Sequence, residues 1–111
     1  MSWVNLYDET AEVLLQHNLS RSDIWFVCTD KEYIDWDEFK DRAQNFKYNN
    51  GFGVEEVRID LKIVGKDWWL ERWSYDGAEG WQFKQKPDFA TKTHNGLLDI
   101  SEGARFHEIF G

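Results

Sequence analysis

The fold of this chain is decided by residues 57–86, which read VRIDLKIVGKDWWLERWSYDGAEGWQFKQK. Apolar and polar side chains alternate along this stretch, and a period of two is typical of β-strands. Gly65-Lys66 and Asp76-Gly77 interrupt the alternation, and both pairs match the residue preferences of two-residue hairpin turns. The stretch therefore predicts a meander of three antiparallel strands.

The two turns also predict a register. The first turn places Val64 opposite Asp67, and the second places Tyr75 opposite Ala78. Both registers sort the side chains onto the same two faces, which supports the assignment. The face expected in the core collects Val57, Ile59, Leu61, Ile63, Trp68, Leu70, Trp81 and Phe83, with Arg72 near its edge. The opposite face collects Arg58, Asp60, Lys62, Trp69, Glu71, Trp73, Tyr75, Gln82 and Lys84.

Two helices and a short hairpin are predicted before the meander. Residues 3–17 carry apolar side chains at helical spacing, and a second such stripe follows the capping sequence DWDE at 35–38. Between them, IWFVC at 24–28 predicts a strand, and residues 33–34 predict a short return strand. We therefore expect an α+β fold, with an antiparallel sheet of three to five strands and two helices packed on one of its faces.

Two further segments complete the predicted organisation. Residues 47–54, KYNNGFGV, predict a loop into the meander. Pro87 cannot donate to a strand ladder and should end the last strand. The expected domain spans residues 1–87. Residues 88–111 form a C-terminal arm whose seven apolar side chains are too many for a free tail, so we expect it to dock on the same domain, with a short helix beginning at 101–104.

Composition narrows the classes of function. A chain of 111 residues predicts one domain, and its net charge of −8 should repel nucleic acids and anionic membranes. The single Cys28 excludes an internal disulfide and fits a reducing compartment. Because no apolar run is long enough to span a membrane and no signal pattern is present, we expect a soluble cytoplasmic protein without membrane contact.

No motif identifies a reaction. His17, His94 and His107 lack the spacing of zinc ligands, and the sequence has no phosphate-binding glycine loop. We therefore predict no catalytic residue, metal or cofactor, with a small enzyme of unknown reaction as an alternative. The carboxylates of residues 30–41 fit helix capping and a solvated face, or else an acidic recognition surface made of Asp35, Asp37, Glu38 and Asp41.

The polar face of the meander is the first candidate binding site. Aromatic and arginine side chains are the usual anchors of protein interfaces. The face is open to three interpretations: the C-terminal arm covers it, it binds a protein partner or a second copy of the chain, or it stacks single-stranded nucleic acid, which the net charge disfavours. Its predicted binding residues are Trp69, Trp73, Tyr75, Arg58, Lys62, Glu71 and Lys84.

The hairpin segment VGKDWWLERWSYDGAEGWQFKQKP at 64–87 combines WWLER, YDG and W-x-F-K before a proline. In this pattern it resembles a recurring segment of small bacteriophage and prophage proteins. The resemblance covers roughly residues 10–87 and implies origin without an activity. It is carried by Trp68, Trp69, Leu70, Glu71, Arg72, Tyr75, Asp76, Gly77, Glu79, Trp81, Phe83, Lys84 and Pro87, with a looser match at Glu38, Phe39, Lys40, Gly51, Phe52 and Gly53.

Together these features predict a small acidic phage-type accessory protein that acts by binding another protein. The partner we expect is a basic nucleic-acid-binding complex, such as a host defence system, which the acidic surface would inhibit in the manner of an anti-CRISPR protein. The alternatives are a self-associating structural protein that uses the aromatic sheet face, which would form a homodimer, and a small enzyme.

Overall fold

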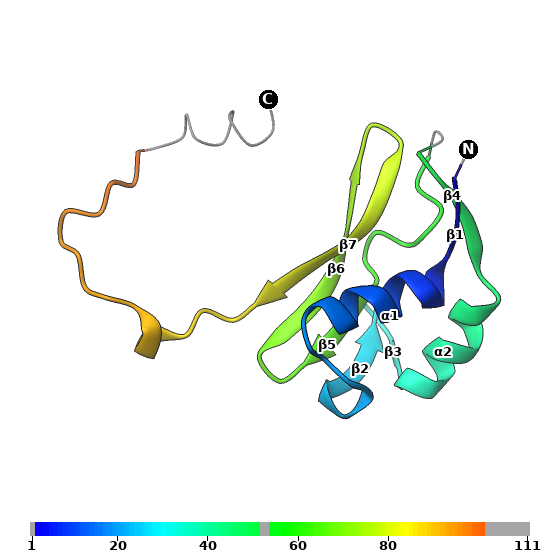
Figure 1. Ribbon diagram of the computed structural model, residues 1–111, viewed down its shortest axis with the longest axis horizontal. Coiled ribbons are helices and arrows are strands. Elements are labelled where there is room, and N and C mark those ends of the chain that lie inside the picture. Colours follow the sequence, from blue (N-terminus) through cyan, green and yellow to red (C-terminus); the bar gives the residue numbers. More distant parts are fainter. Residues whose placement is uncertain (1, 52–53, 102–111) are drawn as a thin grey trace.

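The computed structural model describes residues 2–51 and 54–101 (Figure 1). Within these ranges it contains a five-stranded antiparallel sheet of order β3-β2-β5-β6-β7 and a two-stranded sheet of β1 and β4. Helices α1 and α2 lie on one face of the larger sheet, which confirms the predicted α+β fold. The elements in chain order are β1 (Ser2–Asn5), α1 (Leu6–Gln16), η1 (Arg21–Asp23), β2 (Ile24–Cys28), β3 (Tyr33–Ile34), α2 (Trp36–Gln44), β4 (Lys47–Asn50), β5 (Lys62–Gly65), β6 (Trp68–Tyr75), β7 (Ala78–Gln85) and η2 (Phe89–Thr91).

The helices are bounded by local signals. At the start of α1 the side chain of Asn5 accepts a hydrogen bond from the Asp8 N–H at 3.0 Å. After its end, Asn18 adopts a φ of 56°, the left-handed conformation that often terminates helices. At the start of α2, Asp35 and Glu38 form the reciprocal capping box expected from the sequence.

The core lies between the helices and the sheet. Apolar side chains of both helices meet those of the central strands β2, β5 and β6, where Val27, Ile63 and Leu70 are fully buried. Removing such surface from water is the main force that holds the layers together. The buried apolar side chains are Leu6, Leu14, Val27, Phe39, Ala43, Tyr48, Val57, Ile63, Trp68, Leu70 and Trp81.

The second hairpin has the predicted register. Tyr75 pairs with Ala78, and the pairing continues through Arg72 opposite Trp81. The two turn residues have φ values of 49° at Asp76 and 86° at Gly77. Positive φ at both central positions defines the turn that this sequence pair favours, so local chemistry alone sets this register.

The first hairpin differs from the prediction by two positions. Val64 pairs with Trp69 rather than facing Asp67, and the turn consists of Lys66 and Asp67. Gly65 is not a turn residue: a Cβ at that position would lie 2.1 Å from Nε1 of Trp68 and 2.7 Å from the Asp23 carbonyl oxygen. The glycine therefore permits close packing. The observed register is shifted by two residues from the predicted one. Because side chains alternate with a period of two, each side chain still points to the predicted face of the sheet.

The meander also starts later than predicted. Its first strand begins at Lys62, and residues 57–61 form a loop with a turn in which the Leu61 N–H donates to the Arg58 carbonyl at 3.2 Å. Val57 remains buried at 5% exposure, whereas Ile59 is 58% exposed and does not join the core.

A second sheet appears where the sequence predicted helix and loop. Residues 2–5 and 47–50 pair as β1 and β4, with Val4 opposite Tyr48, so α1 begins only at Leu6. Tyr48 is fully buried, and its burial anchors a segment whose Asn and Gly content resembles a loop. Tertiary packing thus overrides local propensity here.

The described part of the C-terminal arm, residues 88–101, leads away from the sheet in Figure 1. Four of its large apolar side chains are 70–92% exposed: Phe89, Leu97, Leu98 and Ile100. Docking of the arm on the domain stays a prediction, and the short helix expected from 101–104 onward lies outside the described residues. No helix in the described ranges has both the length and the apolar character needed to cross a bilayer.

Candidate functional site

The outer face of the five-stranded sheet is a candidate binding surface. In the described chain both α-helices lie on the opposite face, and residues 86–101 are exposed instead of lying over the sheet. We call this surface the aromatic face. It comprises Phe26, Tyr33, Lys62, Val64, Trp69, Glu71, Trp73, Tyr75 and Lys84.

Strand pairing brings these side chains together. Val64 pairs with both Phe26 of β2 and Trp69 of β6, and Trp69 pairs in turn with Lys84 of β7. Paired residues point to the same side of a sheet, so they form one row across four strands. Tyr33 of β3 extends the row, with its ring edge-on to Phe26 at a centroid distance of 6.1 Å.

Trp73 and Tyr75 continue the aromatic face along β6. Trp73 lies opposite Gly80, where an added Cβ would be 3.0 Å from the indole Nε1, so the indole packs directly on the glycine backbone. Trp73 is still 39% exposed, and Tyr75 is 77% exposed. Large aromatic side chains that are fixed on a strand yet open to water are typical anchors of protein interfaces.

Glu71 orients one aromatic ring of this face. The Trp69 Nε1–H donates to Oε1 of Glu71 at 2.7 Å, which satisfies the polar atom of the indole. Lys62 lies 3.9 Å from the Asp30 carboxylate, a long and solvent-exposed ion pair that contributes little to stability. The face therefore offers a rigid aromatic surface with cations at Lys62 and Lys84.

Six of the seven predicted face residues are brought together, and Arg58 is the exception. It lies in the loop before β5, where Nε and Nη2 each donate to the Asp60 carboxylate at 2.8 Å. These hydrogen bonds lower the pKa of Asp60 well below its usual range. The sequence placed Arg58 on the face because it extended β5 to Val57.

The predicted acidic surface lies on α2, and its carboxylates differ in their roles. Asp35 and Glu38 are exposed but form the capping box. Asp37 pairs with Arg21 of η1. The Asp41 carboxylate is exposed and forms no hydrogen bond or ion pair within the described ranges. Asp41 is therefore the position at which the charge of this surface can change without loss of a structural contact.

A buried ionic network joins the two layers on the core side. Arg72 of β6 donates from Nη1 to Glu9 of α1 at 3.0 Å, and from Nη2 to Glu79 of β7 at 3.1 Å and to the Tyr48 hydroxyl at 3.3 Å. Its guanidinium also lies over the ring of Trp81 at 4.8 Å. The network thus fixes the position of α1 relative to the sheet.

Electrostatics in this network favour a structural role. Burial opposes the charge of Arg72, but hydrogen bonds to Tyr48 and Glu9 keep the pKa of its guanidinium above the usual value. Burial, followed by the hydrogen bond to Glu9, raises the pKa of Tyr48 to about 12. Neither group exchanges a proton near neutral pH, which general acid–base catalysis would require.

The sequence analysis missed this network, although one signal was available. Arg72 was placed at the edge of the core face, whereas its side chain is fully buried. An arginine in register with Trp81 on an apolar face requires a buried acidic partner. Glu79 lies on the same face two residues from Trp81 and could have been named, while Glu9 is 63 residues away and could not.

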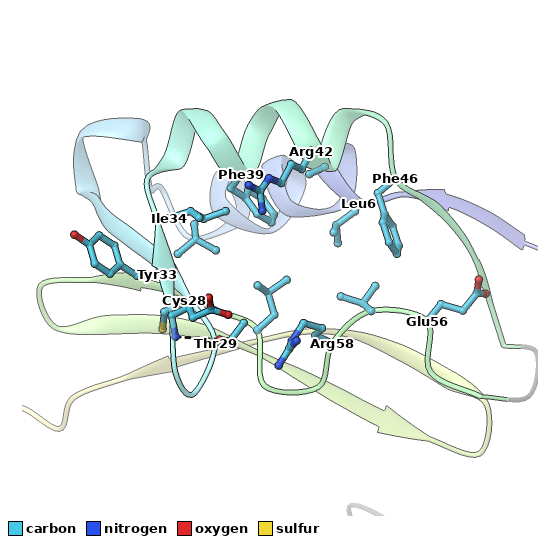
Figure 2. Close-up of a pocket in the computed structure, with 15 residues that line it drawn as sticks. Leu6, Cys28, Thr29, Tyr33, Ile34, Phe39, Arg42, Phe46, Glu56 and Arg58 are labelled. Atoms are coloured by element: carbon cyan, nitrogen blue, oxygen red, sulfur yellow. Dashed lines mark hydrogen bonds between the residues drawn. The ribbon is translucent and has the colours of Figure 1, made fainter.

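A cavity of about 470 Å³ opens between α2, the β2–β3 hairpin and the loop before β5 (Figure 2). Leu6, Ile34, Phe39 and Phe46 lie along one wall, and Arg58 and Glu56 project from the loop opposite. Sequence patterns gave no signal for this cavity, because it depends on the distance between a helix and an irregular loop. The lining residues are Leu6, Val27, Cys28, Thr29, Glu32, Tyr33, Ile34, Phe39, Arg42, Ala43, Phe46, Glu56, Val57, Arg58 and Leu61.

The histidines and the cysteine of the described ranges do not gather into a metal site. No set of three His, Cys, Asp or Glu side chains there could hold a metal ion. His17 stacks on Phe83 with the ring centroids 4.0 Å apart. Cys28 lines the cavity, and burial raises the pKa of its thiol, so the reactive thiolate is disfavoured near neutral pH.

Comparison of the chain with protein-family models, curated proteins and solved structures found no match. The resemblance of residues 64–87 to phage proteins therefore stays a prediction, and any functional proposal depends on the geometry of the chain itself.

Proposed function

We propose that this protein acts by binding another protein through its aromatic face. The observation that carries the proposal is the group of aromatic side chains on the side of the sheet opposite the helices. Within it, Trp73 is 39% exposed and Tyr75 is 77% exposed. A solvated face of an antiparallel sheet normally carries polar side chains. Exposed aromatic patches of this kind mark interaction sites.

The net charge supports a basic partner. A chain of charge −8 attracts proteins with positive surfaces and repels nucleic acids. We propose a basic nucleic-acid-binding complex as the partner, in keeping with the resemblance to phage proteins and with inhibition of a host defence system in the manner of an anti-CRISPR protein. The acidic residues of α2 would then contribute to the speed of association, while the aromatic face supplies the anchors.

Capture from nuclease-treated bacterial lysate tests the proposal. The immobilised wild type is compared with the double variant Trp73→Ala/Tyr75→Ala, and captured proteins are identified by mass spectrometry. We expect a basic protein to be captured by the wild type and lost from the variant, because removal of central aromatic anchors commonly weakens binding by tenfold or more.

The matched control is Trp3→Ala. Trp3 is 65% exposed but belongs to β1 in the other sheet, so its loss removes a comparable apolar side chain from a different surface. Retention of the partner by Trp73→Ala/Tyr75→Ala would exclude the aromatic face. Retention by this double variant with loss by Asp41→Lys would assign binding to the acidic surface of α2.

Self-association is a second candidate function, and the exposed arm favours it. Phe89, Leu97, Leu98 and Ile100 present apolar surface that the described part of the same molecule leaves exposed. An arm of one copy could cover the aromatic face of another, which would bury apolar surface of both. The expected result is a mass that rises with concentration in analytical ultracentrifugation and reverts to a monomer in Trp73→Glu. A monomer at all concentrations would reject this candidate.

A further inference from the structure

The cavity beside α2 shares Tyr33 with the aromatic face and is otherwise lined by different residues. We propose that it binds a free medium-chain carboxylate, with the hydrocarbon chain inside the cavity and the carboxylate on Arg42. This site is independent of the proposed protein binding, since it lies between α2 and the loop before β5.

The size of the cavity fits a chain of this length. Small-molecule sites usually enclose roughly 300–1,000 Å³, and this cavity has about 470 Å³. At about 30 Å³ per water-sized unit, that volume holds roughly 15 such units. A saturated carboxylate with eight to ten carbons has about ten to twelve non-hydrogen atoms, which leaves room for water at the opening.

The walls of the cavity are suited to a hydrocarbon. Protein interiors are normally close-packed. The side chains that line this cavity are instead in contact with water, although most of them are apolar. Replacing that water with methylene groups is favourable, because apolar area is removed from water on both the ligand and the protein. The apolar side chains of the lining are Leu6, Val27, Ile34, Phe39, Ala43, Phe46, Val57 and Leu61.

The charged side chains of the lining point to an anionic head group. Arg58 is already bound by both of its donor atoms to Asp60. The pKa of Arg58 is raised mainly by Asp60 and to a smaller extent by Glu32, so Glu32 lies within the field of this cation. Glu56 accepts a hydrogen bond from the Asn49 N–H at 2.9 Å.

Unlike Arg58, which is bound to Asp60, Arg42 has a guanidinium with no ion pair or hydrogen bond within the described ranges. Figure 2 shows it extending from α2 beside Phe39 at the wall of the cavity. A guanidinium binds a carboxylate through two parallel hydrogen bonds. A monoanion fits better than a phosphate, because the net charge of −8 disfavours ligands with several negative charges.

Titration of the ¹⁵N-labelled full chain with sodium octanoate and, separately, with 1-octanol tests the site. The two probes share a chain length and differ in the head group. We expect octanoate in the millimolar range to shift the amide signals of Val27, Ile34, Ala43 and Val57. Arg42→Gln should weaken octanoate binding about tenfold and leave octanol binding unchanged, because a hydrogen bond to a charged group is lost.

Lys66→Gln is the matched control. It removes the same charge from the exposed β5–β6 turn, outside the cavity lining, and should leave the affinity for octanoate unchanged. Leu61→Phe supplies a second test, because the larger side chain fills part of the cavity. This variant should weaken the binding of both octanoate and octanol.

Three outcomes would overturn the proposal. These are the absence of shifts at the lining residues, equal weakening of octanoate binding by Arg42→Gln and Lys66→Gln, and unchanged binding of both probes to Leu61→Phe. Arg42 is exposed, so Arg42→Gln should fold normally, and its amide spectrum without ligand checks this.

Discussion

Arg72 is the residue through which the polar groups of the core are connected. It joins α1, β4, β6 and β7 by donating to Glu9, Tyr48 and Glu79. A buried ion pair contributes little net stability compared with an apolar alternative, because desolvation offsets much of the attraction. Removal of one partner is costly, because it leaves the remaining charges buried and uncompensated.

Arg72→Ala is therefore expected to destabilise the protein strongly. The change leaves two carboxylates without a cation and removes the ring contact with Trp81, so the free energy of unfolding should fall by about 3–5 kcal/mol. Urea denaturation followed by tryptophan fluorescence measures it. Arg58→Ala is the control, because it removes an arginine whose side chain is 66% exposed and should therefore cost much less stability. Equal effects of the two substitutions would contradict the structural role of the network.

Tyr48 predicts a loss of stability at alkaline pH. Its pKa is raised from 10.0 to about 12 in the folded protein, so the folded state keeps the hydroxyl proton where the unfolded chain releases it. Stability from this group is complete below pH 10 and is lost as the pH rises through 12. A shift of this size corresponds to roughly 2–3 kcal/mol.

Urea denaturation between pH 9 and 12 measures this effect, and Tyr48→Phe serves as the comparison. The phenylalanine variant has no hydroxyl at this position, so its stability should decline less steeply over the same range. Parallel declines in both proteins would assign the alkaline loss of stability to other groups.

Among the helices and strands, α2 is the one whose start is most clearly fixed by neighbouring residues. Its capping box consists of two reciprocal hydrogen bonds, from the Glu38 N–H to Asp35 at 2.8 Å and from the Asp35 N–H to Glu38 at 3.1 Å. Asp35→Ala should lower the free energy of unfolding by about 1 kcal/mol. Asp41→Ala changes the same net charge without loss of a cap and should have almost no effect in the same denaturation experiment. A similar loss in both variants would show that net charge, and not capping, governs the stability of this helix.

The β5–β6 hairpin depends on the absence of a side chain at Gly65. A methyl group there would overlap the Trp68 indole and the backbone of Asp23, which cannot move without disturbing η1 and β2. Gly65→Ala is expected to cost about 1–3 kcal/mol through overpacking. Gly51→Ala is an informative comparison, because Gly51 has open space around its Cβ position but a φ of 93°, so any loss there comes from backbone strain alone. A smaller loss at Gly65 than at Gly51, again in urea denaturation, would contradict the packing role.

The accuracy of the sequence predictions followed the range of the interactions involved. The Asp76-Gly77 turn and the capping box at Asp35 depend on neighbouring residues, and both were predicted correctly. The pairing of β1 with β4 joins segments about 45 residues apart, so no local pattern announces it. The register of the first hairpin was wrong because Gly65 was interpreted by its turn propensity, when its role is close packing.

The predictions for the aromatic face were also correct where they depended on local sequence and wrong where they depended on distant segments. Alternation along β6 and β7 was enough to place Trp69, Trp73 and Lys84 on one face, since a strand fixes side-chain direction. Arg58 was misplaced because nothing in its sequence shows where β5 begins. Phe26 and Tyr33 were not assigned to the face, because their position depends on the order of β2 and β3 in the sheet, which the sequence does not encode locally.

At the scale of the whole molecule, the two candidate sites are built from different layers. The aromatic face uses the outer side of the sheet, whereas the cavity lies between α2 and the loop before β5. Tyr33 borders both sites, but Trp73 and Arg42 belong to one site each. Substitution of Trp73 should therefore leave ligand binding in the cavity unchanged, and Arg42→Gln should leave partner binding unchanged, because distant residues without shared contacts usually act independently.

The arm provides a prediction at this scale. Removal of residues 88–111 tests whether the arm docks on its own domain. The described part, residues 88–101, buries no large apolar side chain against the body, so its loss should leave the free energy of unfolding nearly unchanged. Thermal unfolding of the full chain and the shortened chain at low concentration measures this difference. A large loss of stability on truncation would show that the arm docks on its own domain.

The order of the strands gives the sheet two unequal edges. β3 ends one side with only two residues, while the eight-residue β7 forms the other edge, on which the Glu79 N–H already donates to the Asn50 side chain at 2.9 Å. Strand addition needs a row of free backbone groups, and two residues offer too few of them. Copies that joined β7 to β7 would leave only the two-residue β3 at each outer end of the joined five-stranded sheets. Association by this route would stop at a twofold pair and could not grow into a filament.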